Sequence, residues 1–293
     1  MLQFKNYYSP ETVSNLFDTI NAAEKPWVLI AGGTDLYAKE HKALKGAVSA
    51  VDISGIDEFR RIDVTSDTVT VGAATPIQRF CDDPVLIGHL PLMRHAACFF
   101  ADQQIRQMAT LGGNLANASP VGDTIPCLMV LEARINTCRM ENGAVIRDRI
   151  PMDGFVNGVG KTALRDGEII SSVTFPVLQD YGCAFKKVGL RRSLCISTAN
   201  AAFMVKVSPD KETFEDVRIA YGAVGPTPMR VSDVEQYLKG KPVSADVIED
   251  SVSCLPEDLI RSRSRREYRK IVAVNFLKAG LAEALADAGI SVR

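Results

Sequence analysis

Clustered cysteines are missing from this chain. Its 293 residues include seven cysteines, and no two of them form a Cys-x-x-Cys pair or stand at metal-ligand spacing from a histidine. Iron–sulfur clusters and structural zinc ions need such grouped ligands. We therefore predict that this chain alone holds no metal site, and scattered thiols of this kind are typical of a reducing compartment.

Histidine is also scarce, which restricts the catalytic chemistry that the chain can offer. His41, His89 and His95 are its three histidines, and they form no HExxH pair. They also give no basis for a Ser-His-Asp or Cys-His arrangement. We therefore predict no catalytic acid, base or nucleophile on this chain.

The chain also lacks an excess of charge of one sign and a long hydrophobic run. The 34 Lys and Arg residues against 35 Asp and Glu residues give a formal net charge of -1, so no overall field attracts nucleic acid or an anionic membrane. No apolar segment approaches the ~18 residues of a membrane span, and the first residues lack a signal-peptide pattern. We expect no membrane span and a cytoplasmic location.

Two local motifs could suggest nucleotides or nucleic acid, but both are weak. Gly158-Val159-Gly160-Lys161-Thr162 resembles the end of a P-loop, yet Phe155 stands where the first glycine is required. We interpret this motif as a surface turn. Residues 261–270 carry six basic residues and one acidic residue, but no series of aromatic residues interleaves them. They are interpreted as the solvated start of a helix, with no nucleic-acid partner.

The order of the expected elements predicts an α+β protein. A capped helix over residues 9–22 precedes a short strand over 27–30, and a second strand over 48–53 completes a small βαβ-like unit. Alternating residues over 61–64 and 68–72 predict a β-hairpin.

The second half of the chain continues this mixture. A helix over residues 125–131 precedes paired strands over 133–137 and 144–146. From about residue 176, consecutive strands near 183–188, 201–207 and 217–224 indicate an antiparallel sheet, and the remainder is helical.

Two glycine-containing segments stand out. The first glycine segment, Ala31-Gly32-Gly33-Thr34-Asp35, directly follows the strand over 27–30. The second glycine segment, residues 110–123, combines Gly112 and Gly113 with small polar residues and Asp123. We interpret both as loops whose backbone N–H groups approach an anion, because glycine tolerates φ > 0. A tight turn with a capped helix start at residues 119–120 is the alternative for the second segment.

Together the two segments suggest a diphosphate held from two sides. Asn114, Asn117 and Ser119 offer further hydrogen-bonding groups, and the Asp123 carboxylate suits the hydroxyls of a sugar alcohol. FAD contains both a diphosphate and a sugar alcohol, so the pattern favours FAD as the ligand.

Taken in order, these motifs resemble the FAD-binding (medium) subunit of the molybdenum hydroxylases, the xanthine dehydrogenase and carbon monoxide dehydrogenase family. The resemblance covers essentially the whole chain. Beyond the two glycine segments it rests on Gln104-Ile105-Arg106, Gly167-Glu168-Ile169-Ile170, Phe185-Lys186 and Gly225-Pro226-Thr227-Pro228 with Arg230.

The resemblance implies three parts. Residues 1–55 and 56–175 would be two FAD-binding subdomains of the PCMH, vanillyl-alcohol-oxidase-like type, and residues 176–293 an α+β C-terminal domain with an antiparallel sheet. Asp123 would bind ribityl or ribose hydroxyls, and Ile169, Ile170 and Lys186 would lie near the flavin ring. The diphosphate would be held by the remaining candidates, which are Ala31, Gly32, Gly33, Thr34, Asp35, Thr110, Gly112, Gly113 and Asn114.

The resemblance also implies partner subunits and a route for electrons. A large subunit with a molybdenum–molybdopterin centre would oxidise the substrate, for which xanthine or another purine is our hypothesis. A small subunit with two [2Fe-2S] clusters would pass the electrons to FAD, which would reduce NAD+ or another acceptor. Val159-Gly160 stands where related dehydrogenases often carry an aromatic-Arg pair near the flavin and the NAD site, so ferredoxin or a quinone stays open as the acceptor.

Two other interpretations remain at this point. One is a self-contained FAD-dependent oxidoreductase, such as a cell-wall precursor reductase or an aromatic alcohol oxidase, which would need substrate-binding catalytic residues in the C-terminal domain. The other is a non-catalytic nucleotide-binding scaffold. The intact glycine segments argue against the scaffold, and the C-terminal part shows no obvious catalytic set.

Overall fold

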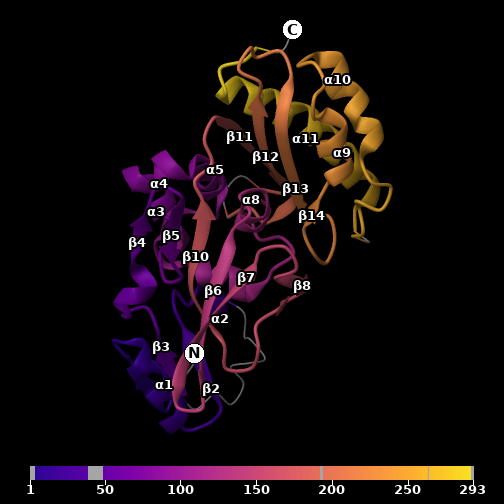
Figure 1. Ribbon diagram of the computed structural model, residues 1–293. Coiled ribbons are helices and arrows are strands. Elements are labelled where there is room, and N and C mark those ends of the chain that lie inside the picture. The colour runs from indigo at the N-terminus through magenta and orange to yellow at the C-terminus, as the bar shows by residue number, and fades with distance from the viewer. Residues whose placement is uncertain (1–3, 39–48, 192–193, 263, 292–293) are drawn as a thin grey trace.

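Three main sheets follow one another along the long axis of the protein, as the computed structural model shows (Figure 1). The structure describes residues 4–38, 49–191, 194–262 and 264–291. A small parallel sheet lies at the bottom of Figure 1, a five-stranded antiparallel sheet at the centre, and a four-stranded antiparallel sheet at the top. The α+β fold class predicted from the sequence is confirmed.

The small sheet has the strand order β1-β3-β2, and all its strands are parallel. Its elements are β1 (Asn6–Tyr8), α1 (Val13–Ala22), β2 (Trp27–Ile30), α2 (Thr34–Ala38) and β3 (Ser49–Asp52). Helix α1 starts later than the predicted residue 9, because the Thr12 hydroxyl caps it by accepting from the Asn15 amide. The predicted βαβ unit is confirmed, although residues 39–42 of its expected helix lie outside the described residues.

The central sheet has the order β4-β5-β10-β6-β7, so the strand that comes last in the sequence lies in the middle. Val173 of β10 lies between Val71 of β5 and Ile135 of β6, and all three are fully buried. Both predicted strand pairs, β4–β5 and β6–β7, are confirmed. The strands are β4 (Ile62–Val64), β5 (Thr68–Gly72), β6 (Arg134–Glu141), β7 (Ala144–Pro151) and β10 (Ile169–Pro176).

Short helices from the middle of the chain contribute most of the core that covers this sheet. These helices are α3 (Arg79–Asp82), α4 (Pro84–His89), α5 (Pro91–Phe99), α6 (Gln103–Met108), α7 (Leu111–Asn117) and α8 (Thr124–Val130), after the 3-10 turn η2 (Asp57–Arg60). A small hairpin, β8 (Val156–Gly158) with β9 (Lys161–Thr162), contains the glycines of the P-loop-like motif. Gly160 has φ +64° at its turn, so the predicted surface turn is confirmed.

The C-terminal sheet consists of consecutive antiparallel strands, as predicted. They are β11 (Tyr181–Gly189), β12 (Ser197–Val207), β13 (Phe214–Gly222) and β14 (Met229–Arg230), followed by α9 (Ser232–Leu238), α10 (Ala245–Asp250), η3 (Ser251–Cys254) and α11 (Arg266–Asp287). Helix α11 packs on β11 and β12. Within the basic run, Arg269 is buried and donates to the carbonyls of Thr198 and Ala223, so this residue does not belong to a solvated helix start.

No helix in the described ranges is both long enough and apolar enough to cross a membrane. The three-part division at residues 55 and 175 stays a prediction. The chain passes from one sheet to the next close to these two positions, because β3 ends at Asp52, β10 ends at Pro176 and β11 begins at Tyr181.

A substitution at Gly280 would test how tightly α11 packs against the C-terminal sheet. A Cβ atom at Gly280 would lie 2.3 Å from the Phe203 ring of β12, and this ring is fully buried. We expect Gly280→Val to lower the free energy of unfolding by about 2 kcal/mol through overpacking. Ala279→Val, at the exposed neighbouring position, should change it little. Thermal and urea unfolding of both variants would measure the difference, and equal stabilities would contradict this packing.

Candidate functional site

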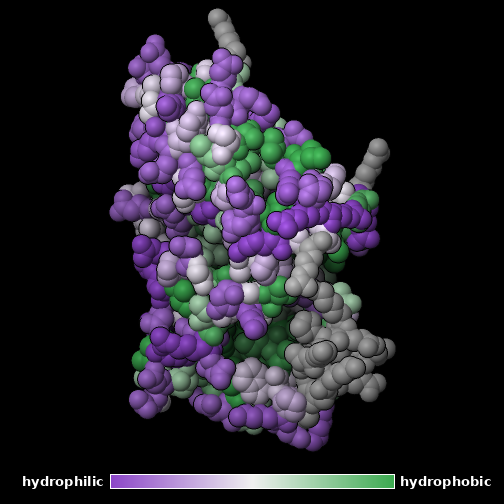
Figure 2. Space-filling view, turned by 90° about the vertical axis from the view of Figure 1, so that its right-hand side faces the viewer, coloured by the Kyte–Doolittle hydropathy of each residue, from purple (hydrophilic) through white to green (hydrophobic). Residues whose placement is uncertain are grey.

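A cavity of about 350 Å³ lies between the small parallel sheet and the central sheet. Its volume is within the range of small-molecule sites. Figure 2 shows a hollow with hydrophobic walls in the lower half of the molecule. The lining of the cavity includes all five residues of the first glycine segment and six of the fourteen residues of the second, all six between Thr110 and Asn117.

The first glycine segment forms one wall of the cavity. It turns the chain from β2 into α2, and Gly33 at this turn has φ +68°, a conformation that glycine adopts without strain. A Cβ atom on Gly32 would lie 1.7 Å from the carbonyl oxygen of Met108. Gly32 is therefore needed for the close approach of this segment to the end of α6.

The second glycine segment differs from the predicted loop, because Leu111–Asn117 forms helix α7. Neither Gly112 nor Gly113 has a positive φ. The Thr110 hydroxyl caps the helix by accepting from the Gly113 amide at 3.0 Å. A Cβ on Gly112 would lie 2.6 Å from the Cβ of Ala73, so this glycine allows close packing of α7 on the end of β5.

The amide groups at the start of α7 are already used within the protein. Leu111 N donates to Thr75 O at 3.0 Å, and Gly112 N donates to Ala73 O at 2.7 Å. Diphosphate binding by Thr110 to Asn114 stays a prediction. The first turn of α2 also lies at the cavity, which Thr34, Asp35 and Leu36 line, and the start of a helix is a favourable place for a phosphate.

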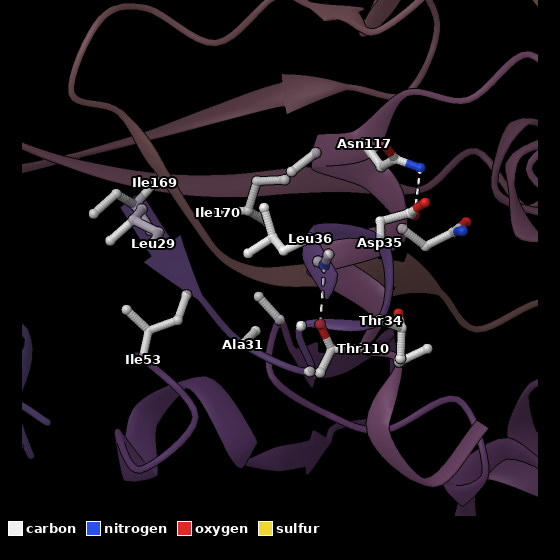
Figure 3. Close-up of a pocket in the computed structure, with 18 of the residues that line it drawn as sticks. Leu29, Ala31, Thr34, Asp35, Leu36, Ile53, Thr110, Asn117, Ile169 and Ile170 are labelled. Atoms are coloured by element: carbon white, nitrogen blue, oxygen red, sulfur yellow. Dashed lines mark hydrogen bonds between the residues drawn. The ribbon is translucent and has the colours of Figure 1, made fainter. Parts of the chain in front are cut away.

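One end of the cavity is polar and is crossed by a hydrogen bond. The Asn117 side-chain amide donates to a carboxylate oxygen of Asp35 at 2.6 Å and joins the ends of α7 and α2 (Figure 3). Asn114 also lines the cavity, and its side-chain oxygen accepts from the Thr124 hydroxyl at 2.6 Å. The Asn117–Asp35 bond joins the two walls of the cavity, and the Asn114–Thr124 bond joins α7 to α8.

The opposite end is apolar. Figure 3 shows Leu29 and Ile53 of the small sheet region facing Ile169, with Ile170 nearer the centre. Glu168 beside them also lines the cavity, and its carboxylate accepts from the Thr137 hydroxyl at 2.5 Å and from the Arg165 amide at 2.9 Å. A flat aromatic ring system would find an apolar surface at this end.

Three predicted site residues do not line the cavity. Ser119 accepts from the Val121 amide at 3.4 Å in the segment after α7. Asp123 is buried, and its carboxylate contacts Lys187, Ser197 and Asn200. The binding of ligand hydroxyls by Asp123 stays a prediction.

Lys186, the third of these residues, forms an ion pair with Glu283 of α11. Its neighbour Lys187 is the buried one, with a side chain only 3% exposed. The sequence could not distinguish the two lysines, because neighbouring residues of a strand point to opposite faces and either face could have been the buried one.

Other lining residues were not predicted from the sequence. Phe100 stands just before α6, and Ile53 directly follows β3. The position of Ile53 at the end of a predicted strand could have indicated that it lines the site. No sequence pattern indicated the same for Phe100. The remaining missed residues are Leu29, Leu36, Ala73, Ala109, Ala116, Leu164 and Glu168.

The arrangement fits FAD in its chemistry. The apolar end suits a flavin ring, and the glycine-lined centre beside the first turn of α2 suits a diphosphate. Among the described residues, no group of three His, Cys, Asp or Glu side chains could hold a metal ion.

Comparisons with known proteins identify the same ligand. Residues 2–178 match the family model of the FAD binding domain in molybdopterin dehydrogenase, and residues 184–284 match the CO dehydrogenase flavoprotein C-terminal domain. The chain is 30% identical to the xanthine dehydrogenase FAD-binding subunit of Escherichia coli O157:H7, over 99% of both chains. It is 28% identical to the carbon monoxide dehydrogenase medium chain of Hydrogenophaga pseudoflava, over 94% of this chain and 95% of that one.

The structural comparison agrees. A chain of the carbon monoxide dehydrogenase from Hydrogenophaga pseudoflava superposes with a TM-score of 0.85 and 27% identity, covering 98% of this chain and 99% of that one. The predicted resemblance and the predicted fold, an FAD-binding domain followed by an α+β C-terminal domain, are thereby confirmed. This chain belongs to the FAD-binding subunits of the molybdopterin dehydrogenases, the molybdenum hydroxylase type of oxidoreductase.

Proposed function

We propose that this chain is the electron-transfer subunit of a heteromeric molybdenum hydroxylase and that it holds FAD in the cavity between its first two sheets. The convergence of the two glycine segments on one cavity carries the proposal, because it provides a glycine-lined centre with an apolar end and a polar end. In this proposal the first turn of α2 binds the diphosphate, and Leu29, Ile53 and Ile169 contact the flavin ring.

The proposed partners are a large subunit with the molybdenum–molybdopterin centre and a small subunit with [2Fe-2S] clusters. The relatives support this division of labour, because they are described as an FAD-binding subunit and a medium chain. The scattered cysteines of the sequence support it too, since the cluster ligands would then lie on another chain.

The task of this chain is to bind, orient and enclose the cofactor, while a bound flavin supplies the redox chemistry itself. Buried Ile169 and Ile170 exclude water from one side of the ring position. The Asn117–Asp35 hydrogen bond fixes the opposite end. We predict no catalytic acid or base among the side chains of this chain.

For the electron acceptor we propose NAD+, and for the substrate of the complex a purine. The 30% identity to a xanthine dehydrogenase subunit supports the substrate class. Other relatives, 28 to 29% identical, are medium chains named for carbon monoxide and glyceraldehyde. The substrate test must therefore include a simple aldehyde alongside xanthine.

A substitution at Gly113 would test whether the cofactor occupies the proposed cavity. It lines the cavity, and an added Cβ would meet only the Thr110 hydroxyl, at 2.8 Å. We expect Gly113→Val to abolish FAD binding, because the branched side chain would fill the space that the cofactor needs, while the loss of the helix cap would cost only about 1 kcal/mol of stability. Flavin absorbance and fluorescence titration of the purified chain would measure this.

Gly88→Val is the matched control for this substitution. Gly88 lies on helix α4, and a Cβ there would meet no atom within 4 Å. This variant should bind FAD as the unmodified chain does. Normal flavin occupancy in Gly113→Val would refute the position given to the cofactor.

The subunit assignment is tested by comparing the isolated chain with its complex. The isolated chain should bind FAD but oxidise neither xanthine nor an aldehyde, because the substrate site would lie on the large subunit. Co-purified from its native source with its partners, it should couple xanthine oxidation to NAD+ reduction. Substrate turnover by the isolated chain would instead identify a self-contained oxidoreductase.

A further inference from the structure

Two cysteines come together on the short helices that cover the central sheet. Cys81 lies on α3 and Cys98 on α5, and these two helices pack against each other (Figure 1). Helix α4 lies between them in the sequence, and the Asp83 side chain caps it by accepting from the amides of Val85 and Leu86. Because α4 is short, α5 packs back on both α3 and α4.

The two thiols are direct neighbours. Burial is the main reason that the pKa of the Cys81 thiol rises to about 11, and the Cys98 thiol contributes to the rise through its charge and through a hydrogen bond. Cys98 is exposed, whereas Cys81 is half-buried and packs against the hydrophobic core. The pair therefore combines one accessible thiol with one protected thiol.

This combination differs from the surroundings of three other cysteines. Cys127, Cys138 and Cys183 are buried, and burial raises the pKa of each thiol. Buried thiols of this kind are inert, because the thiolate is the reactive form. An accessible thiol beside a second thiol is instead the arrangement in which oxidation leads to a disulfide.

We propose that Cys81 and Cys98 are a redox-sensitive dithiol, which hydrogen peroxide oxidises to a disulfide that joins α3 to the end of α5. Cys98 is the attacking thiol, because it is the exposed one. Its thiolate attacks one oxygen of the peroxide and the O–O bond breaks. A sulfenic acid forms on Cys98, and the other oxygen takes up the proton that the thiol has lost and leaves as water.

The second step needs no further oxidant. The sulfur of Cys81 attacks the sulfur of the Cys98 sulfenic acid, so that the S–S bond forms and the S–O bond breaks. The oxygen leaves as water with the proton of the Cys81 thiol. The two thiols together lose two electrons, and one molecule of peroxide gains them.

The position of the pair connects its oxidation to the cofactor cavity. Helix α5 ends at Phe99, directly after Cys98, and the next residue, Phe100, lines the cavity. Arg106 of α6 donates to the carbonyl oxygen of Phe100 at 3.0 Å and to the side-chain oxygen of Gln78, the residue before α3, at 2.8 Å. With both thiols free, the Phe100 wall is therefore held between α3 and α6.

A disulfide would disturb this wall. Two bonded sulfur atoms are closer than two thiols in contact, so the bond draws the end of α5 toward α3. Phe100, two residues after Cys98, would move with it. A displaced wall has to be restored when a ligand binds, which lowers the affinity. This consequence rests on the proposed occupation of the cavity by FAD, whereas the disulfide itself does not.

Peptide mapping of the full chain tests the disulfide. Trypsin cuts after Arg94, which separates Cys81 from Cys98. After treatment with hydrogen peroxide and digestion without reductant, mass spectrometry should find the two peptides joined, and dithiothreitol should separate them. Cys98→Ser should prevent the link. Cys254→Ser, at a partly exposed thiol on η3, is the matched control and should preserve it. Unlinked peptides from the treated unmodified chain would overturn the proposal.

Trapping with dimedone, a reagent for sulfenic acids, tests which thiol attacks. In Cys81→Ser the sulfenic acid on Cys98 has no thiol to resolve it, so Cys98 should be labelled. In Cys98→Ser, Cys81 should stay unlabelled, because its thiol is half-buried and remains protonated. Labelling of Cys81 as strong as that of Cys98 would overturn the assignment of Cys98 as the attacking thiol.

Flavin fluorescence titration tests the consequence for the cavity. The disulfide-linked chain should bind FAD about threefold more weakly than the reduced chain, because the Phe100 wall is displaced. Peroxide treatment of Cys98→Ser should leave the affinity unchanged. Equal affinities of the reduced and the disulfide-linked chain would refute the connection to the cavity. A reduced chain that binds no FAD would instead refute the cofactor assignment, and the peptide map would still decide whether the disulfide forms.

Discussion

The contact between Gly32 and the carbonyl oxygen of Met108 is the constraint on which the cavity depends. No side chain fits between these two backbones, because a Cβ would lie 1.7 Å from the oxygen. The small parallel sheet can therefore approach the end of α6 only through glycine. This approach brings the first glycine segment opposite α7, and the cavity is the space that remains between them.

Despite their similar composition, the two glycine segments have different conformations and different backbone contacts. The first places helix-start amides at the cavity, where an anion can accept from them. In the second, the amides of Leu111 and Gly112 are bonded to backbone carbonyls of residues 75 and 73, and glycine serves close packing against Ala73. No residue of the C-terminal sheet is among the described residues that line the cavity, yet this sheet holds Asp123, the last residue of the second segment, through a buried ion pair.

Much of the fold could be predicted from the sequence, because periodicity and hairpin spacing are local signals. The strand Trp27–Ile30, the hairpins of the central sheet and the consecutive C-terminal strands follow from such signals. Helix α7 could not be predicted, since paired glycines lower helix propensity and only tertiary packing and the Thr110 cap offset that cost. The orientations of Asp123 and Lys187 depend on burial by distant strands, which no local pattern encodes.

The central position of β10 has a consequence for the order in which the molecule can be completed. Its neighbours β5 and β6 end at Gly72 and Glu141, whereas β10 extends to Pro176. Until β10 has been synthesised, these two strands have no partner between them, and the wall that contains Ile169 and Ile170 does not exist. A nascent chain therefore carries both glycine segments well before it can enclose a cofactor, and the non-local closure of the sheet sets the earliest moment of flavin capture.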